Sequence, residues 1–559
     1  MSAVQKSQTQ IDFTIKSDKK LDQKFKDRRS AELVIALAGP IGCGIGGVAK
    51  SLEERLREHG YSNVVRIKLS EFLETVINER LIQIPSTIEG ESSRFNRYRR
   101  LQEGGKELRR QTKNPAVLAE YATQQISIDR LKRDKNQQDR SMGPIVPFKV
   151  AYVIDQVKRP EEVTLLRAVY RNLFYLAGIT RIYSKRRDAL VAEGVGANEV
   201  DGLMEIDRME DGEDGQQLDK TLLLADYFIR NDSMTADDKN EKLNRFLELI
   251  HGDQSVTPTE IESGMFAAYS AGLRSACLSR QVGAAIASKS GEVIATGCND
   301  VPKAGGGLYS HASGTGDMRC IRREDQSCSN DLHKRKLQLE VSTIIDRVLG
   351  EDGGDINGEA PIKLSALRRD KLLDAIYKET RIKDLIEYSR SVHAEMDAIV
   401  SLARLGSSGL QNATLYTTTF PCHNCARHIV ASGIMKVFYV EPYEKSLAKD
   451  LHNDAIAFEV EESKNASPRR VEFLHFEGVA PRQFNNMFRA IGRKNSEGKF
   501  IPIRASDSHK AIPEYLDGYQ DFEDKAIQHF VDEITTLREN PSKNSSVDST
   551  EVSTIKPLS

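Results

Sequence analysis

Two short segments carry the residue types and the spacing of a catalytic zinc site. SVHAEMDAIV holds His393 and Glu395 at the start of an expected helix, and FPCHNCAR holds Cys422 and Cys425 three positions apart. Zinc accepts imidazole and thiolate ligands, and a catalytic site keeps its fourth tetrahedral position open for water. One histidine and two cysteines would supply three ligands at a helix start, which leaves Glu395 to move protons beside the metal.

Each half of this pattern is a weak indication of function by itself, but the two halves together are specific. A lone CxxC pair is as often a redox or structural-zinc motif, and His423 could complete a closed site with four ligands. An HxE segment followed by PCxxC is the signature of zinc-dependent cytidine and adenosine deaminases. In that chemistry water attacks the pyrimidine carbon that bears the amino group, while the glutamate passes protons to the ring nitrogen and the departing ammonia. The catalytic interpretation is therefore preferred.

A sheet must position these residues, and the second half of the chain predicts one. GAAIASKSGEVIATGCND indicates two strands joined at Ser290-Gly291, and further strands are expected at 413–419 and in KVFYVEPY. One helix is expected to start near His393 and another after Pro421. The predicted apolar face of the first helix comprises Val392, Met396, Ile399 and Val400.

The first half of the chain alternates strand and helix patterns, which favours a parallel sheet covered by helices. Apolar runs at 33–38, 64–70 and 149–154 predict strands, and LLLADYFIRND predicts another. A helix is expected at Pro160, because proline suits a first helical turn. The acidic, glycine-rich segment 193–220 predicts a surface loop or lid.

The segment GPIGCGIGGVAKS is similar to the phosphate-binding loop G-x-x-x-x-G-K-[ST], and it lies between a strand and a helix. Ile45 stands in the place of the lysine, and Lys50 comes too late in the helix to replace it. The backbone amides could still cradle a phosphate, but phosphoryl transfer in its usual form is not expected. A glycine turn without a ligand is the alternative. The residues predicted to contact phosphate are Gly39, Gly42, Gly44 and Gly46.

Composition narrows the class of protein. The 559 residues carry 80 basic and 82 acidic side chains, a net charge of −2. A chain of this length predicts at least two domains, and the near-neutral charge suits a small anionic ligand better than double-helical DNA. We recognise no apolar run of about 18 residues and no secretory leader, and the seven cysteines suit a reducing compartment. A cytoplasmic protein without a membrane span is expected.

Residues 262–490 resemble the deoxycytidylate deaminases. The segments that carry the resemblance are, in order, SGMFAAYSAGLRSACLSRQVGAAIAS, ATGCNDVPKAGG, HAEMDAIV, ATLYTTTFPCHNCARHIVASGI and VFYVEPY. The resemblance implies a mixed central sheet between helices, a zinc cofactor and a homo-oligomer. It also implies roles for the matching residues: zinc ligands His393, Cys422 and Cys425, proton-shuttling acid Glu395, sugar and base contact Asn299, and phosphate contacts Tyr443 and Lys445.

The fusion of the two blocks resembles the bacterial anti-phage deoxycytidine nucleotide deaminases over about 31–535, including the segment VEFLHFEGVAPRQFNNMF. This resemblance implies that dCTP and dCMP are deaminated, which depletes the cytosine nucleotide pool and starves phage replication. It further implies an enzyme held silent until infection, in some members by a partner RNA. A regulatory nucleotide at the N-terminal block is another expected partner.

The predicted fold is α/β, with a P-loop NTPase-like parallel sheet and its helices at the N-terminus. A cytidine-deaminase-like α/β/α sandwich is predicted at the C-terminus. The expected divisions are a polar arm (1–30), a kinase-like domain (31–235), a connector (236–260), a deaminase domain (261–535) with an insertion at 303–390, and a disordered tail (536–559).

Alternatives stay open at this point. Basic segments at 97–100 and Lys185–Arg187 would suit a deaminase that acts on a flipped base in RNA or single-stranded DNA. A binding module with a scaffold-only deaminase fold would need a disabled metal site. A second, structural metal could lie in the insertion, although reduced cysteines are preferred there. The residues available for it are His311, Cys320, Cys328 and His333.

Overall fold

The structure is a computed structural model. It describes residues 29–85, 91–138, 149–208, 214–232, 235–349, 366–380, 382, 385–407, 409–442, 446–458, 470–489, 493–502, 512–514 and 519–539. The predicted arm and tail lie outside these residues except for 29–30 and 536–539, and Tyr443 and Lys445 lie outside them as well.

Six strands form the first of two sheets. They are β1 (Leu33–Ala38), β2 (Asn63–Lys68), β3 (Val150–Asp155), β4 (Phe174–Thr180), β5 (Tyr227–Arg230) and β12 (Gly478–Val479). Their order is β12-β5-β4-β1-β3-β2, and β1 to β5 run parallel as the sequence pattern predicted. The strands β1 and β4 are buried along their whole length, which is typical of a parallel sheet covered on both faces.

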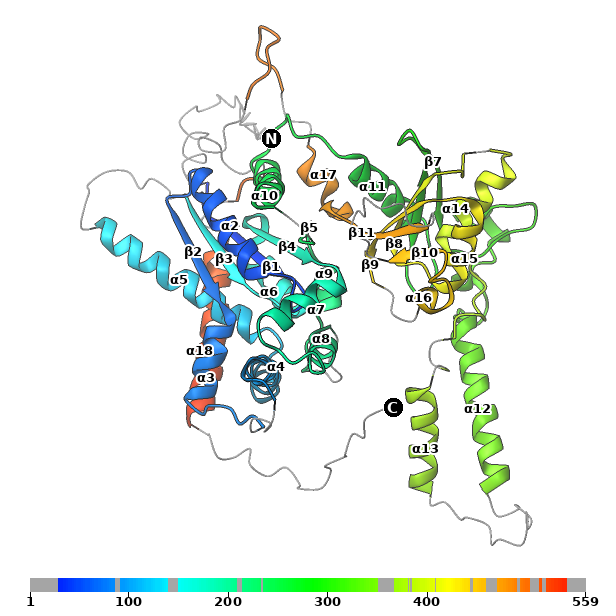
Figure 1. Cartoon of the computed structure of the whole chain (residues 1–559), viewed down its shortest axis with the longest axis horizontal. Helices are drawn as coiled ribbons and strands as arrows, with labels where there is room; N and C mark the ends of the chain where they lie inside the picture. Colours follow the sequence, from blue (N-terminus) through cyan, green and yellow to red (C-terminus); the bar gives the residue numbers. More distant parts are fainter. Residues whose placement is uncertain are drawn as a thin grey trace, which may run out of the picture.

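Helices cover both faces of this sheet (Figure 1). On one face α2 (Ile45–Glu58) and α10 (Ala236–His251) share a core cluster with β1 and β5. On the other face lie α5 (Val117–Gln138), α6 (Pro160–Tyr170) and α18 (Gln520–Glu539). The remaining helices of this half are α3 (Leu69–Asn78), α4 (Ser93–Thr112), α7 (Tyr183–Ala192), α8 (Val200–Arg208) and α9 (Leu218–Leu222).

Two segments expected to be irregular are helical. The expected connector at 236–260 contains α10, whose Leu243, Phe246 and Leu247 are buried at helical spacing between charged residues. The expected loop or lid at 193–220 contains α8 and α9, since apolar residues such as Leu203 lie among its acids and glycines. Both segments are therefore parts of the first half's fold rather than linkers.

The end of the described chain also packs on the first sheet. The strand β12 pairs with β5, and α18 lies along α5. At the centre of the second contact, the guanidinium of Arg130 is bidentate to Glu32, with Nε–Oε1 3.0 Å and Nη2–Oε2 2.9 Å, and its Nη1 binds Glu523 of α18. The expected deaminase domain at 261–535 thus contains elements that pack with the N-terminal half.

The second sheet is mixed. Its strands are β6 (Gly283–Ala287), β7 (Val293–Cys298), β8 (Thr414–Thr419), β9 (Lys436–Glu441), β10 (Ile456–Phe458) and β11 (Val471–His475), in the order β10-β11-β9-β8-β6-β7. Helix α11 (Glu260–Gly272) covers one face. The helices α14 (Ala394–Arg404), α15 (His423–Ser432) and α16 (Ala448–Leu451) cover the other, which gives the predicted α/β/α sandwich.

Apolar and polar contacts join the two halves. One core cluster contains residues of both sheets, including Phe228 of β5 and Tyr416 of β8, and the Phe228 ring packs edge-on against Phe476. The carboxylate of Glu262, which is 1% exposed, accepts hydrogen bonds from the amide of Val479 and the guanidinium of Arg245. The two sheets are therefore held against each other by a buried interface.

The insertion at 303–390 carries two helices, α12 (Ser329–Leu349) and α13 (Ala366–Glu379), which extend away from the second sheet (Figure 1). His311, Cys320, Cys328 and His333 do not gather into a metal-binding group, although all four are described. The second metal considered from the sequence is therefore not supported. Among the described residues, no helix has the length and apolar character needed to cross a membrane.

Candidate active site

Helix α14 presents His393 and Glu395 at its first turn. His393 is the N-cap residue, with extended backbone angles, and Glu395 lies in the first turn. The buried face of the helix consists of Ala394, Glu395, Ala398, Ile399 and Leu402. Val400, predicted as part of the apolar face, is 49% exposed, because the face that meets the sheet is rotated toward the alanines.

Close packing against β7 sets the position of α14. A Cβ atom added to Gly297 would lie 2.2 Å from the carbonyl oxygen of Ala394 and 2.5 Å from the amide nitrogen of Ala398. Only glycine permits this approach of the two backbones. In addition, the Asp397 carboxylate accepts a hydrogen bond from the Cys298 amide at 3.1 Å. The start of α14 is thus fixed on the sheet.

Helix α15 brings the two cysteines to the same place. Cys422 is its N-cap residue, and its sulfur accepts a hydrogen bond from the amide of Cys425 at 3.5 Å. Both side chains are buried, at 5% and 1% exposure. The positive end of the helix dipole favours thiolates at this position.

The imidazole and the two thiols converge. The Nδ1 atom of His393 lies 3.3 Å from the sulfur of Cys422 and 3.3 Å from the sulfur of Cys425. The three ligand atoms lie within 4.8 Å of one another, as a single metal ion requires. His423, the fourth ligand that a closed structural site would need, is not a member of this group. The arrangement therefore suits a zinc site with one position open.

Glu395 lies beside this group with almost no contact to solvent. Its side chain is 4% exposed, and its Oε2 atom lies 3.5 Å from the sulfur of Cys425. Burial raises the pKa of the Glu395 carboxyl, and the nearby His393 opposes this shift. A buried carboxyl next to a metal-binding group is suited to take up and release protons.

The two cysteine thiols have pKa values that are shifted in opposite directions. Hydrogen bonds from Cys425 and then from His393 lower the pKa of the Cys422 thiol to about 4, against the effect of burial. The pKa of Cys425 is raised, first by its hydrogen bond to Cys422 and then by burial. The hydrogen bond to Cys422 raises the pKa of His393 to about 9. One thiolate is therefore already favoured, and metal binding would displace the protons that remain on the Cys425 thiol and on the His393 imidazole.

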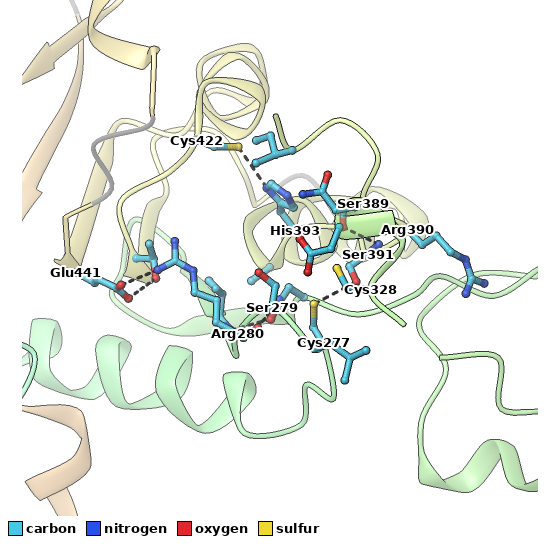
Figure 2. Close-up of a pocket in the computed structure, with 18 of the residues that line it drawn as sticks. Cys277, Ser279, Arg280, Cys328, Ser389, Arg390, Ser391, His393, Cys422 and Glu441 are labelled. Atoms are coloured by element: carbon cyan, nitrogen blue, oxygen red, sulfur yellow. Dashed lines mark hydrogen bonds and ion pairs between the residues drawn. The ribbon is translucent and has the colours of Figure 1, made fainter. Parts of the chain in front are cut away.

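The group lies in the wall of a cavity of about 520 Å³. Figure 2 shows His393 and Cys422 on one side of this cavity and Arg280 with Glu441 on another. The Arg280 guanidinium binds the Glu441 carboxylate at 2.6 Å, and Glu441 also accepts a hydrogen bond from Thr419 at 3.0 Å. These contacts give the cavity a polar wall next to the metal-binding group.

Asn299 lines the same cavity and is rigidly held. It is 7% exposed, donates through Nδ2 to the carbonyl of Arg280 at 2.8 Å, and accepts through Oδ1 from the amide of Val282 at 2.7 Å. The structure thus brings Asn299 to the predicted metal-binding group, while Tyr443 and Lys445 lie outside the described residues.

Several cavity residues were not expected from the sequence. Lys220 and Leu223 come from the first half of the chain, and Ser329, Asn330 and Lys334 come from the start of α12 in the insertion. No motif marks them, because they reach the cavity through the packing of distant segments. Arg280 lies within the segment SRQVG next to β6, and only its position beside Asn299 distinguishes it from a surface arginine.

The glycine loop lies elsewhere, at the carboxyl end of β1 in the middle of the first sheet. Gly42 and Gly44 adopt left-handed backbone angles, with φ of 79° and 80°. The strand order reverses at β1, since β3 lies on one side of it and β4 on the other. Ligands of open α/β sheets bind at the carboxyl ends of the strands at such a reversal. Of the other predicted phosphate contacts, Gly39 follows β1 directly and Gly46 lies in the first turn of α2.

Comparisons with known proteins agree with the chemistry of the first site. Residues 258–441 match the family model "Cytidine and deoxycytidylate deaminase zinc-binding region", which makes zinc the cofactor of this region. The deoxycytidylate deaminases of Enterobacteria phages T4 and T2 are each 33% identical over 180 residues, or 32% of this chain and 76% and 78% of theirs. The dCMP deaminase of cyanophage S-TIM5, solved with dCMP and dUMP, aligns over 39% of this chain and 98% of its own, with 19% identity and a TM-score of 0.21.

Proposed function

The chain belongs to the deoxycytidylate deaminase family, and we propose that it hydrolyses the amino group of free deoxycytidine nucleotides at the site formed by His393, Cys422, Cys425 and Glu395. The observation that carries the proposal is the convergence of three zinc-type ligand atoms beside a buried carboxyl in the wall of a cavity. The products would be the corresponding uracil nucleotide and ammonia.

The donor set fits zinc. His393 would bind through Nδ1 and the two cysteines through their sulfurs, and the ion would supply the charge that lowers the pKa of a water molecule. The donors come from the N-termini of two different helices, so their relative position depends on the sheet beneath them. A shift of either helix on the sheet would therefore move the ligand atoms apart.

Glu395 performs the proton transfers in this proposal. Deamination adds water at the ring carbon that bears the amino group, breaks the carbon–nitrogen bond and releases ammonia. The Glu395 carboxylate accepts a proton from the water, delivers it to the adjacent ring nitrogen, and later carries the second proton to the leaving amine. Its 4% exposure keeps bulk water away from these transfers.

The cavity walls would select the substrate. Asn299 is held in one orientation by its bonds to Arg280 and Val282, which suits a contact to the sugar and base. Lys220 and Lys334 place positive charge in the walls, as a phosphate-bearing substrate requires, whereas the charge of Arg280 is paired with Glu441. Both dCMP and dCTP are proposed substrates.

The wider role rests on the resemblance of the two fused blocks. We propose a P-loop-class nucleotide-binding N-terminal block, and depletion of the deoxycytidine triphosphate pool as a defence against phage. The parallel sheet with β1 at its centre supports the first part. All seven cysteines are free thiols, which supports the cytoplasmic location. The homo-oligomer and the regulatory RNA are carried by the resemblance alone.

A panel of substrates tests the proposal. Zinc-loaded protein is incubated with dCMP, dCTP, a cytosine-containing single-stranded DNA and an RNA of the same sequence, with Glu395→Ala as the blank. We expect uracil from the free nucleotides and none with Glu395→Ala. Uracil from the oligonucleotides alone would contradict the proposal and would favour a deaminase that acts on a flipped base.

A further inference from the structure

A buried carboxylate occupies the glycine loop between β1 and α2. Asp207 of α8 is 2% exposed. Its Oδ2 atom accepts a hydrogen bond from the backbone amide of Ile41 at 2.7 Å, and its Oδ1 atom pairs with the ammonium group of Lys158. A backbone amide of a glycine loop and a lysine ammonium are the donors that phosphate-binding loops offer to an anion.

Lys158 supplies the cation that the loop itself lacks. Ile45 stands where a phosphate-binding loop has its lysine, at the start of α2. Lys158 lies shortly after β3, the parallel neighbour of β1, so that its side chain reaches the same end of the sheet. Its position next to the loop comes from the strand order and not from the motif.

Further positive charge surrounds the loop. Arg181 donates through Nη1 to the carbonyl of Gly42 at 3.1 Å, and a Cβ atom on Gly42 would lie 2.6 Å from the carbonyl oxygen of Arg186. The Nε atoms of both arginines are buried and have no hydrogen-bond partner within the described part of the chain. The Arg186 guanidinium also lies over the ring of Tyr183. Lys158 and these two arginines are three cations, and the acids that lie near them are Asp207 and Asp219, so positive groups are in excess.

We propose that the loop Gly39–Gly44 and Lys158 form a binding site for a phosphate group, and that Asp207 fills this site as an internal counter-anion. The proposal extends the nucleotide-binding role proposed above for the N-terminal block and is independent of the deamination chemistry. A phosphate carries more charge and more acceptor oxygens than a carboxylate, so it matches the excess of donors better. Binding would require that Asp207 leave the loop.

Competition by Asp207 can be measured directly. Isothermal titration of the full-length, zinc-loaded protein is performed with ATP and, separately, with inorganic tripolyphosphate. We expect Asp207→Asn to bind at least one of them about tenfold more tightly than the wild type, because the competing charge is removed. Binding of both indicates a site for phosphate itself, and binding of ATP alone indicates that a nucleoside is also recognised.

Two further variants locate the effect. Asp201→Asn removes an equal charge from the exposed side of the same helix and is expected to leave the affinity of the wild type unchanged. Lys158→Met in the Asp207→Asn background is expected to abolish the gain. Equal affinities of Asp207→Asn, Asp201→Asn and the wild type would overturn the proposal, and so would a gain that survives Lys158→Met.

Hydrogen exchange of the wild type provides a measurement that does not depend on the folding of a variant. Saturation with ATP or tripolyphosphate is expected to speed amide exchange in residues 200–208, since Asp207 must leave the loop. Unchanged or slower exchange there in a protein that binds the ligand would refute the role of Asp207 while the nucleotide-binding role stands. Absence of binding to any of the forms would refute both, and deamination of dCMP would remain a separate question.

Discussion

Glu395 occupies an environment that a carboxylate rarely has in a folded protein. Its side chain is 4% exposed, and its Oε2 atom lies 3.5 Å from the sulfur of Cys425. Burial of this kind costs stability unless the charge is paired. The nearby convergence of His393 and two cysteines gives the carboxyl a chemical role that explains the cost.

A partly buried carboxyl, Asp219, allows a prediction for the pH dependence of stability. Burial raises the pKa of Asp219 to about 6, against the attraction of Arg208 at 3.6 Å. The folded state therefore holds this proton to higher pH than the unfolded state does. The stability that the protonated form retains at low pH is lost as pH rises from about 4 to about 6, and the loss is constant above that range.

Asp219→Asn should remove this loss. Relative to the wild type, its free energy of unfolding is expected to increase by about 1 to 2 kcal/mol between pH 4.5 and pH 7, and then to stay level. Thermal or denaturant unfolding of both proteins at four pH values measures this. Asp188→Asn, on the exposed side of α7, is the control and should show no such trend. A constant difference between Asp219→Asn and the wild type would contradict the account.

At the scale of elements, the glycine in β7 allows the metal-binding helix to approach the sheet. The approach of Gly297 to Ala394 and Ala398 leaves no space for a Cβ atom. Helix α14 must therefore move if Gly297 is replaced, and His393 and Glu395 move with it. The positions of His393 and Glu395 thus depend on Gly297, which takes no part in the reaction.

Gly297→Ala is expected to destabilise the protein by about 1 to 3 kcal/mol and to lower zinc content and deamination together. Unfolding, metal analysis and initial rates with dCMP measure the three effects. Gly316→Ala, a site where a Cβ atom meets nothing within 4 Å, should leave all three unchanged. If Gly297→Ala kept full zinc and full activity, α14 would not be positioned in this way.

The sequence predicted the elements that carry strong local patterns. The apolar runs of β1 and β3, and the strand–turn–strand of β6 and β7 with Gly291 at positive φ, were all expected. Strand β4 was not anticipated, because only the short 3-10 turn Arg171–Leu173 separates FYLAGIT from α6. The helix α10 was also missed, since its five buried apolar residues lie among charged residues.

At the scale of the molecule, the described end of the chain returns to the first sheet. Arg130 of α5 lies between Glu32, next to β1, and Glu523 of α18, and all three are buried. The hydroxyls of Tyr519 and Tyr170 donate to the same two carboxylates. Arg130 thus pairs with two buried acids from segments almost 500 residues apart, and Arg133 lies 3.6 Å from the first of them, Glu32.

Arg130→Gln is expected to destabilise the protein by about 3 to 5 kcal/mol, because it removes the cation paired with buried Glu523 and leaves buried Glu32 with the longer contact to Arg133 at 3.6 Å. Arg538→Gln is the control, since this residue is 63% exposed and lies 3.7 Å from Glu79. Its effect should stay within about 0.5 kcal/mol. Urea unfolding of the three proteins compares them, and equal midpoints would show that α18 does not dock through this network.

The same long-range packing explains how far the active site could be predicted. His393, Glu395, Cys422 and Cys425 form a motif and could be identified from spacing, and the structure brings them together. Lys220 and the start of α12 reach the cavity only through tertiary packing, so no local pattern indicates them. Asp207, the proposed counter-anion, could not be identified from the sequence for the same reason, because it lies 166 residues after its partner Ile41.

The central claim is that Glu395 moves protons for the deamination of a free nucleotide at a zinc site. The most direct test is kcat for uracil formation from dCMP and dCTP, with zinc content measured on the same samples, for the wild type, Glu395→Gln and Glu387→Gln. Glu387 is 50% exposed and serves as the matched control. We expect Glu395→Gln to keep its zinc and lose at least about 100-fold in kcat, with Glu387→Gln unchanged. A zinc-loaded Glu395→Gln that retains wild-type kcat would contradict the account.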